Sequence, residues 1–194
     1  MLKVGLTGSI GSGKTLVSKI FEALGINVFY ADSSAKALYE NNEVRKEIIN
    51  IFGTSILTEN NKIDKKAFAE IIFNDKSALK KINSIIHPLV MGDFVKWLMN
   101  HKNDPYILHE AAILFETDLS KEFDFVVAVS APENLRIERI MKRDSVNRET
   151  VIARIRNQWS DEEKTKLADF VILNDENELL IPQVLKINEK LLNR

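Results

Sequence analysis

The sequence predicts an α/β protein built on a five-stranded parallel sheet, and three observations support this class. Short apolar runs alternate with longer runs of helical period along the chain, which is the pattern of parallel strands joined by crossover helices. A glycine-rich turn, Gly8–Thr15, directly follows the first apolar run. A long stretch without strand signals, residues 32–103, separates the second strand from the third, so we expect a helical subdomain inserted there.

The expected elements follow the chain in a simple order. The five strands are Leu2–Thr7, Asn27–Tyr30, Tyr106–Glu110, Phe125–Ser130 and Phe170–Leu173. The inserted helices are Ala35–Asn41, Glu43–Phe52, Asp64–Phe73 and Lys76–Asn100, with Pro88 interrupting or restarting the last. The other helices are Lys14–Leu24, Pro132–Arg143 and Leu179–Leu192, and Gly25 stands at a position typical of a helix end. We therefore expect one domain, 1–194, in which 1–31 and 104–194 form the sheet core.

Composition limits the classes of function. The chain has 194 residues, a net charge of −1 and no cysteine, which excludes a disulfide framework, a cysteine zinc site and a thiol nucleophile. A chain of this length buries roughly 70% of its unfolded surface without such staples. The near-zero charge argues against nucleic acid as a partner, and no run approaches the ~20 apolar residues of a membrane span. Glycines rather than an apolar core follow Lys3, so we expect a cytoplasmic protein without a signal peptide, as a monomer or weak homo-oligomer.

The turn Gly8–Thr15 fits the phosphate-binding pattern G-x-x-x-x-G-K-[ST]. Its glycines permit positive φ angles, so backbone N–H groups close around phosphate oxygens, and the following helix adds the partial positive charge of its N-terminus. We expect Lys14 to reach the β- and γ-phosphates and the Thr15 hydroxyl to ligate Mg²⁺. The strand before the turn and the helix after it complete the motif, which predicts a nucleoside triphosphate site.

A second pattern, Asn61-Lys62-Ile63-Asp64, matches the N-K-x-D sequence of guanine-binding GTPases. It lies within the helical stretch rather than after a late strand, and no D-x-x-G sequence occurs in the chain. We expect a polar turn instead, in which Asp64 caps the helix that begins at Lys65. The missing D-x-x-G also argues against a nucleotide-dependent switch protein, which is the alternative from outside the enzymes.

Asp32 is the candidate catalytic carboxylate. It follows the second strand, at the edge of the sheet where α/β proteins bind ligands. A kinase needs a group there that accepts or orients the proton of an acceptor hydroxyl lying in line with the γ-phosphate. The alternative is a purely structural N-cap for a helix starting at Ser33, and the two roles are compatible.

Arginines predict a mobile lid at about residues 136–158. Arg136, Arg139 and Arg143 fall at i, i+3 and i+7, so they share one face of the predicted helix. Guanidinium groups grip phosphates bidentately, and kinases use such groups to cover the transferring phosphoryl group. A solvated charged face is the alternative. These features together describe a P-loop small-molecule kinase resembling the nucleoside monophosphate kinases in fold.

The sequence as a whole resembles the dephospho-CoA kinase family, over nearly the full length of the chain. Beyond the phosphate loop, the matching segments are "GINVFYADSSAK", "HPLV", "ILFE", and the run from "RIERIMKRDSVNRE" through "RIRNQ" to "KTKLADFVILN". The resemblance implies transfer of the γ-phosphoryl group of ATP to the ribose 3′-hydroxyl of dephospho-CoA, with Mg²⁺, as the last step of coenzyme A synthesis. The alternative is another P-loop small-molecule kinase or a nucleoside monophosphate kinase.

The resemblance also implies roles for particular residues. Asp32 is the acid/base, and Arg139 acts in the lid beside the transferring group. The acceptor subdomain spans residues 32–103 and includes Lys36 and His87, the latter either a substrate contact or a structural residue of the cleft wall. The nucleotide-binding residues are Gly8, Gly11, Ser12, Gly13, Lys14, Thr15, Leu16, Arg143 and Asn174, with Asn174 near the adenine.

Three positions depart from the family pattern. Tyr30 stands where many relatives carry Asp, and Lys36 stands where relatives often carry Arg, which would change a bidentate grip into a point charge. Ala112-Ile113-Leu114 replaces a usual Pro-Leu-Leu sequence. Glu110, at the end of the third strand, has two alternative roles: a water-mediated contact to Mg²⁺, or a cap or surface carboxylate.

Overall fold

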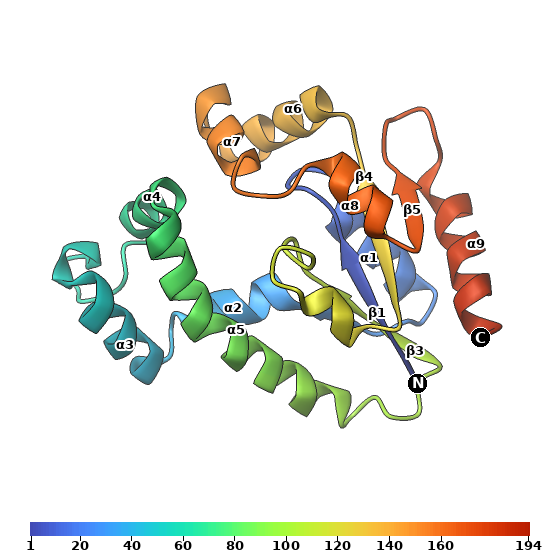
Figure 1. The fold of residues 1–194 in the computed structure, drawn as a ribbon, viewed down its shortest axis with the longest axis horizontal. Coiled ribbons are helices and arrows are strands. Elements are labelled where there is room, and N and C mark those ends of the chain that lie inside the picture. Colours follow the sequence, from blue (N-terminus) through green and yellow to red (C-terminus); the bar gives the residue numbers. More distant parts are fainter. The chain divides into compact units, whose positions relative to one another are not determined.

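The computed structural model contains a five-stranded, entirely parallel sheet (Figure 1). The structure covers residues 1–194 and describes every side chain except those at positions 65, 66, 73, 74 and 76. The sheet has the order β2-β3-β1-β4-β5, which confirms the predicted fold class. The strands are β1 (Leu2–Thr7), β2 (Val28–Tyr30), β3 (Tyr106–Glu110), β4 (Phe125–Ser130) and β5 (Phe170–Leu173).

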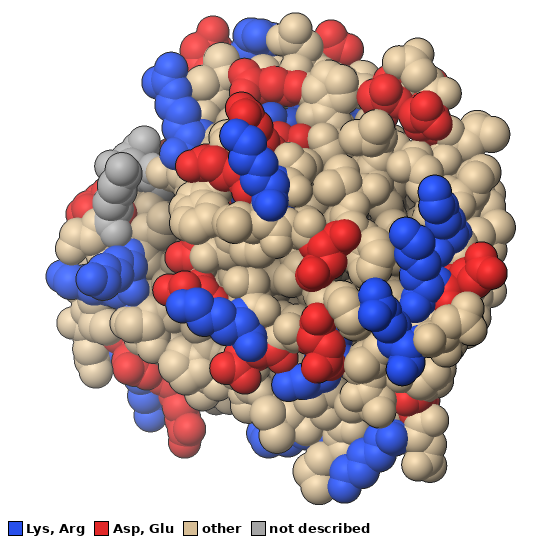
Figure 2. All heavy atoms as spheres, turned by 45° about the vertical axis from the view of Figure 1, so that its right-hand side comes forward, with Lys and Arg blue, Asp and Glu red and all other residues tan. Residues whose placement is uncertain are grey.

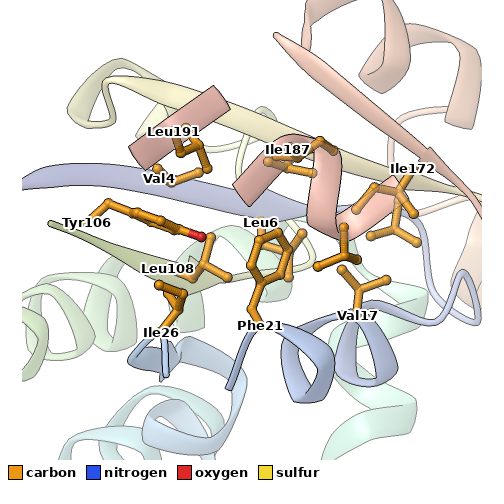
Figure 3. Packing of buried hydrophobic residues seen from close by; sticks show 13 residues of the cluster. Val4, Leu6, Val17, Phe21, Ile26, Tyr106, Leu108, Ile172, Ile187 and Leu191 are labelled. Carbon is orange, nitrogen blue, oxygen red and sulfur yellow. The ribbon is translucent and has the colours of Figure 1, made fainter. Parts of the chain in front are cut away.

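One face of the sheet packs against two helices, α1 (Lys14–Ala23) and α9 (Leu180–Leu192). Side chains alternate along β1, so Val4 and Leu6 point into this layer, where they meet Phe21 of α1 and Leu191 of α9 (Figure 3). Burial of such side chains is worth about 1.5–3 kcal/mol each. This layer fixes the C-terminal end of β1, from which the phosphate loop starts.

The opposite face of the sheet is covered by the segment 111–124. Gly5 of β1 points toward it, and a Cβ atom there would lie 2.6 Å from the end of the Leu114 side chain, so a larger residue would force Leu114 to move. His109 is fully buried on this face, with its ring 5.2 Å from that of Phe29 and 5.0 Å from that of Phe123. Burial lowers the pKa of His109 to about 4, so the imidazole is neutral at pH 7.

The chain divides into two compact units. Unit 1 comprises Met1–Tyr30 and Met99–Arg194, and unit 2 comprises Ala31–Leu98. Unit 2 contains the helices α2 (Ala31–Leu38), α3 (Asn42–Phe52), α4 (Lys65–Asn74) and α5 (Lys76–Leu98), with a 3₁₀ turn at Thr54–Ile56. Unit 1 adds α6 (Glu133–Asp144), α7 (Arg148–Ile155) and α8 (Asp161–Leu167), with a 3₁₀ turn at Leu119–Glu122. Within the described residues, none of these helices combines the length and the apolar composition needed to cross a bilayer.

The first inserted helix begins earlier than the sequence predicts. The structure starts α2 at Ala31, directly after β2, and ends it at Leu38, whereas we expected Ala35–Asn41. Asn41 instead caps α3, since its Oδ1 accepts hydrogen bonds from the backbone N–H groups of Glu43 and Val44 at 2.8 and 3.3 Å. Asp32 therefore lies within the first turn of α2, and the expectation of an N-cap for a helix starting at Ser33 is wrong.

Pro88 does not divide the long helix. Helix α5 continues from Lys76 to Leu98 with Pro88 inside it. The missing N–H of Pro88 would have bonded the carbonyl of Ser84. Both residues are exposed, so water can replace that bond. The predicted interruption is therefore absent.

The predicted polar turn before α4 is confirmed. Asn61 adopts a φ of 56°, and the backbone N–H of Thr58 donates to the carbonyl of Lys62 at 2.8 Å. Asp64 caps α4, because its Oδ1 accepts a hydrogen bond from the N–H of Ala67 at 3.1 Å.

Charged side chains of both signs are interspersed over the face shown in Figure 2. Several form exposed pairs, such as Lys19 with Glu22 and Lys166 with Glu162, both at 2.7 Å. Exposed pairs of this kind contribute little to stability, about 0–1 kcal/mol each.

Candidate active site

The phosphate loop is a tight backbone turn between β1 and α1. Gly8, Gly11 and Gly13 have φ angles of 151°, 81° and 99°, a region that other residues rarely adopt. Space also excludes side chains here, because a Cβ on Gly8 would lie 2.3 Å from the carbonyl oxygen of Val129. A Cβ on Gly13 would lie 2.1 Å from the amide nitrogen of Asn174. The loop is thus packed closely against Val129 in β4 and against Asn174, which follows β5.

Lys14 and Thr15 occupy the first turn of α1. Lys14 is only 8% exposed, and its Nζ donates a hydrogen bond to the carbonyl oxygen of Gly8 at 3.0 Å. This bond holds the ammonium group against the loop. Thr15 and Leu16 are exposed, so the Thr15 hydroxyl is accessible to a ligand at the N-terminus of the helix.

Asn174 and Arg139 tie the loop to two other elements. Asn174 directly follows β5, and its Nδ2 donates to the carbonyl oxygen of Ser12 at 2.7 Å. Both terminal nitrogens of Arg139, in α6, donate to the carbonyl oxygen of Asn174 at 3.2 Å. Arg139 also pairs with Glu176 at 3.3 Å. The structure therefore brings together Ser12, Gly13, Arg139 and Asn174 from the predicted site.

The end of the proposed lid also contacts the loop. The backbone N–H of Ile10 donates to Oε1 of Gln158 at 2.8 Å. The Ile10 side chain packs against a small buried cluster formed by Ile137 and Ile140 of α6 and Val151 of α7. Helices α6 and α7 thus have an apolar core of their own, which includes one side chain of the phosphate loop.

The three arginines predicted on one helix face have separate environments. Arg136 is 4% exposed, and its Nε donates to the carbonyl oxygen of Ala131 at 3.0 Å. Arg143 instead pairs with Asp144 at 2.7 Å, and Arg154 pairs with the other oxygen of that carboxylate at 2.7 Å. The hydrogen bond from Arg143 holds the pKa of Asp144 below its usual value. Of the three, Arg139 contacts another predicted site residue, Asn174, through its side chain. The backbone of Arg136 lies beside Gly11, where a Cβ would be 2.8 Å from the Arg136 carbonyl oxygen.

The candidate acceptor residues lie in unit 2. Asp32 and Lys36 are exposed and four residues apart on α2, so they share one face of the helix. His87, in α5, is half-buried, and burial lowers its pKa. Ser34 links α2 to α5 through a hydrogen bond from its Oγ to Asp93 at 3.2 Å. Within unit 2, the structure therefore places Asp32 and Lys36 on the same exposed surface of α2.

Residues 2–179 of the chain match the family model for dephospho-CoA kinase. The chain belongs to the dephospho-CoA kinase family. A dephospho-CoA kinase from Fusobacterium nucleatum is 42% identical over 174 residues, which covers 90% of each chain. One from Bacteroides fragilis is 38% identical over 187 residues, which covers 96% of this chain and 91% of the relative.

Solved structures agree with the family assignment. A Thermus thermophilus protein superposes with a TM-score of 0.86 at 30% identity, covering 97% of this chain and 96% of its own. Dephospho-CoA kinase from Campylobacter jejuni gives a TM-score of 0.68 at 29% identity, over 98% and 97% of the two chains. A shikimate kinase from Acinetobacter baumannii shares the fold at 16% identity and a TM-score of 0.53, over 100% of this chain and 94% of that one.

A buried ion pair beside the site escaped the sequence analysis. Lys164 of α8 is fully buried, and its Nζ contacts Glu116 at 2.8 Å and the carbonyl oxygen of Ala112 at 2.7 Å. Burial lowers the pKa of Lys164, and Glu116 opposes that shift. Glu116 also accepts a hydrogen bond from the N–H of Trp159 at 3.0 Å, and the Trp159 ring stacks on Phe115 with centroids 6.4 Å apart. The pair fixes the segment that contains Ala112-Ile113-Leu114, because Lys164 contacts both Ala112 and Glu116.

Glu110 and Tyr30 are neighbours in the sheet register. Glu110 is 5% exposed at the end of β3, so it is not a surface carboxylate. Burial is the main cause that raises the pKa of Tyr30, which keeps its hydroxyl neutral. Tyr30 therefore adds no charge beside Asp32 in the chain.

Proposed function

We propose that this protein transfers the γ-phosphoryl group of ATP to the ribose 3′-hydroxyl of dephospho-CoA, giving CoA and ADP. The observation that carries the proposal is a complete phosphate loop, packed by Asn174 and Arg139, in a chain that matches the family over residues 2–179. The family match favours dephospho-CoA as the acceptor over a nucleoside monophosphate, which would be the acceptor of a nucleoside monophosphate kinase. The proposed nucleotide-binding residues are Gly8, Gly11, Ser12, Gly13, Lys14, Thr15, Leu16, Arg143 and Asn174.

In the proposed reaction, the 3′-oxygen of the acceptor attacks the γ-phosphorus while the bond to the β-bridging oxygen of ADP breaks. Asp32 accepts the proton of the attacking hydroxyl and orients it. The transition state is loose, so positioning and charge stabilisation supply most of the rate enhancement. Lys14, the loop N–H groups and the N-terminus of α1 supply the positive potential that stabilises the transferring charge.

Magnesium fits the donor chemistry of the loop. Mg²⁺ prefers hard oxygen ligands and keeps several waters, binding through one or two protein oxygens and the substrate phosphates. The exposed Thr15 hydroxyl on the first turn of α1 is such an oxygen. When bound, the ion neutralises charge on the β- and γ-phosphates.

Two regions complete the proposal. The helical insertion, which we assign to residues 32–103, binds the acceptor, with Lys36 and His87 contributing to the site. Residues 136–158 act as a lid in which Arg139 covers the transferring group. Asn174, held between Arg139 and the loop, is proposed to lie near the adenine.

The direct test is an acceptor screen with Mg-ATP. ADP release should accompany dephospho-CoA and yield a product phosphorylated at the 3′-position, identified by phosphorus NMR. Nucleoside monophosphates serve as the competing acceptors, and a chelator tests the requirement for a divalent cation. Faster transfer to any nucleoside monophosphate than to dephospho-CoA would replace the proposed acceptor.

A further inference from the structure

Lys164 and Glu116 form a buried ion pair, at 2.8 Å, to which the proposed reaction assigns no role. The pair lies where helix α8, the segment after β3 and the end of the lid meet. We propose that this pair positions the end of the lid beside the phosphate loop. The inference rests on the proposed function, because the lid is part of that proposal, and it adds the residues that set the position of the lid.

Glu116 holds the first residue after the lid. Its Oε1 contacts Nζ of Lys164 and also accepts a hydrogen bond from the backbone N–H of Trp159 at 3.0 Å. The Trp159 ring stacks on that of Phe115, with an angle of 6° between the ring planes and centroids 6.4 Å apart. Trp159 is thus fixed, through both its backbone and its ring, to two adjacent residues of the segment after β3.

Gln158, the last residue of the lid, contacts the phosphate loop itself. Its Oε1 accepts a hydrogen bond from the backbone N–H of Ile10 at 2.8 Å. Ile10 belongs to the loop, and its side chain packs against the apolar core of α6 and α7. Because Gln158 directly precedes Trp159, the bond from Trp159 to Glu116 fixes the backbone that carries the Gln158 side chain. A displacement of Trp159 would therefore also displace the contact between the lid and the loop.

Lys164 fixes the other end of the segment after β3. Its Nζ donates to the carbonyl oxygen of Ala112 at 2.7 Å, and the hydroxyl of Thr7 donates to the same oxygen at 3.4 Å. Thr7 is fully buried and directly precedes Gly8, the first residue of the phosphate loop. One ammonium group thus links the start of the loop to the carboxylate that holds the end of the lid.

Stability alone does not explain a charged pair in this place. The Lys164 side chain is 0% exposed and that of Glu116 is 12% exposed. Removing two charges from water is costly, and replacing a buried pair by apolar side chains of similar volume is often neutral or stabilising. An ion pair differs from apolar packing in being directional, because each contact has a donor, an acceptor and a preferred angle. Directional contacts suit a hinge that returns to one arrangement each time the lid closes.

A lid whose end is misplaced covers the transferring phosphoryl group less well. Closure excludes water from the site, and a misplacement of about 1 Å can lower a rate by about 10²-fold. Loss of the pair should therefore slow transfer to dephospho-CoA and favour attack of water on the γ-phosphorus, which releases ADP and inorganic phosphate. The ratio of hydrolysis to transfer then reports the position of the lid rather than the stability of the fold.

The test uses a double variant, Lys164→Met with Glu116→Met, which removes both charges of the pair together. We expect kcat for dephospho-CoA to fall by about ten- to a hundredfold, and the ratio of phosphate release to CoA formation to rise by a similar factor. Hydrogen exchange at the backbone N–H groups of Ile10 and Trp159 should become faster, since the carboxylate no longer holds Trp159. A second variant, Gln158→Leu, leaves the ion pair intact, removes the contact to Ile10 and should raise the same ratio.

Two control variants separate position from stability. Lys166→Met removes an exposed lysine of the same helix, which pairs with Glu162 at 2.7 Å. Tyr106→Phe removes a hydrogen bond of 2.6 Å from a buried core residue to Asn188. Both controls should keep kcat and the ratio of hydrolysis to transfer within about twofold of wild type, although Tyr106→Phe lowers the free energy of unfolding.

Either of two results would overturn the inference. One is an unchanged ratio of phosphate release to CoA formation in the folded double variant or in Gln158→Leu. The other is an equal kinetic loss in Tyr106→Phe, which would trace the losses to stability. Failure of the proposed function is distinct, because wild type itself would then not phosphorylate dephospho-CoA, whereas hydrogen exchange at Ile10 and Trp159 reports the anchor without any acceptor.

Discussion

The candidate site residues of the two units are held in different ways. In unit 1, Lys14 is buried against a carbonyl of its own loop, and Asn174 is fixed between Arg139 and Ser12. In unit 2, Asp32 and Lys36 are exposed on a helix surface. The first arrangement is preorganised by backbone contacts, whereas the second relies on side chains that order around a substrate. Changes in unit 1 should therefore affect chemistry and stability together, and changes in unit 2 should affect them separately.

The largest effect is expected for Lys14→Ala in unit 1. The variant removes the positive partner of the β- and γ-phosphates, and kcat should fall by on the order of 10³–10⁴. Circular dichroism should show an intact fold, while the free energy of unfolding falls because the substitution removes the hydrogen bond from Nζ to the Gly8 carbonyl oxygen. Near-normal turnover by the folded variant would contradict the phosphate-loop assignment.

Asp32→Asn tests the corresponding residue of unit 2. The substitution preserves size and removes the proton acceptor, so kcat should fall by about 10²–10³. Because Asp32 is exposed in the first turn of α2 and does not cap it, the free energy of unfolding should change by less than about 1 kcal/mol. Binding of ATP, measured by calorimetry, should remain near wild type. A variant with full kcat but weak acceptor binding would make Asp32 a binding residue only.

Two glycines with positive φ sharpen the comparison. Gly13→Ala in unit 1 would place a Cβ 2.1 Å from Asn174, whereas Gly53→Ala in unit 2 meets nothing within 4 Å. Backbone strain should lower the free energy of unfolding of both variants by about 1–3 kcal/mol, as measured by urea denaturation. Only Gly13→Ala should also weaken ATP binding, because Asn174 must move away from the loop. Equal ATP affinities in the two variants would argue against a tightly packed loop.

A further expected effect, on stability alone, is a pH dependence centred on His109. The pKa of this buried imidazole is about 4 in the folded protein, below its ordinary value of 6.5. As the pH falls, His109 is protonated in the unfolded chain at a higher pH than in the folded protein. The free energy of unfolding is therefore greatest above about pH 6.5 and decreases as the pH drops toward 4. Between about pH 7.5 and pH 5 the free energy of unfolding should fall by about 2 kcal/mol through this residue.

The matched variants for this effect are His109→Leu and His87→Leu. Urea unfolding at the two pH values should show a reduced pH dependence in His109→Leu. The half-buried His87 of unit 2, whose pKa is also lowered by burial, should contribute less. An unaltered pH dependence in His109→Leu would assign the effect to other groups.

Much of the fold of unit 1 could be predicted from the sequence, since its strands appear as short apolar runs and the three central strands, β1, β3 and β4, are buried on both faces. The limits of β1, β3, β4 and β5 agree with the predicted ones. Helix α2 was misplaced because it begins directly after β2 with no intervening turn, and because Asn41 can end one helix or start the next. The effect of Pro88 depends on its exposure, which spacing alone does not reveal.

The candidate site was predictable where a pattern implies a geometry. The phosphate-loop glycines have positive φ angles, as the motif requires. Helical spacing placed Arg136 and Arg139 on one face but could not show that the first is buried against a carbonyl. Nothing in the sequence distinguishes the buried Lys164 from the exposed Lys166, because only the packing of α8 against the segment after β3 separates them.

The distribution of tryptophan gives each unit its own spectroscopic label. Trp97, near Phe94 with ring centroids 6.2 Å apart, is the single tryptophan of unit 2, and Trp159, 41% exposed and stacked on Phe115, is the single tryptophan of unit 1. Their indoles differ in solvent contact, so their emission maxima and quenching by iodide should differ as well. Replacing either one by phenylalanine leaves a protein whose intrinsic fluorescence comes from a tryptophan in only one unit. Nucleotide binding and acceptor binding thereby become separable optical signals without an added dye.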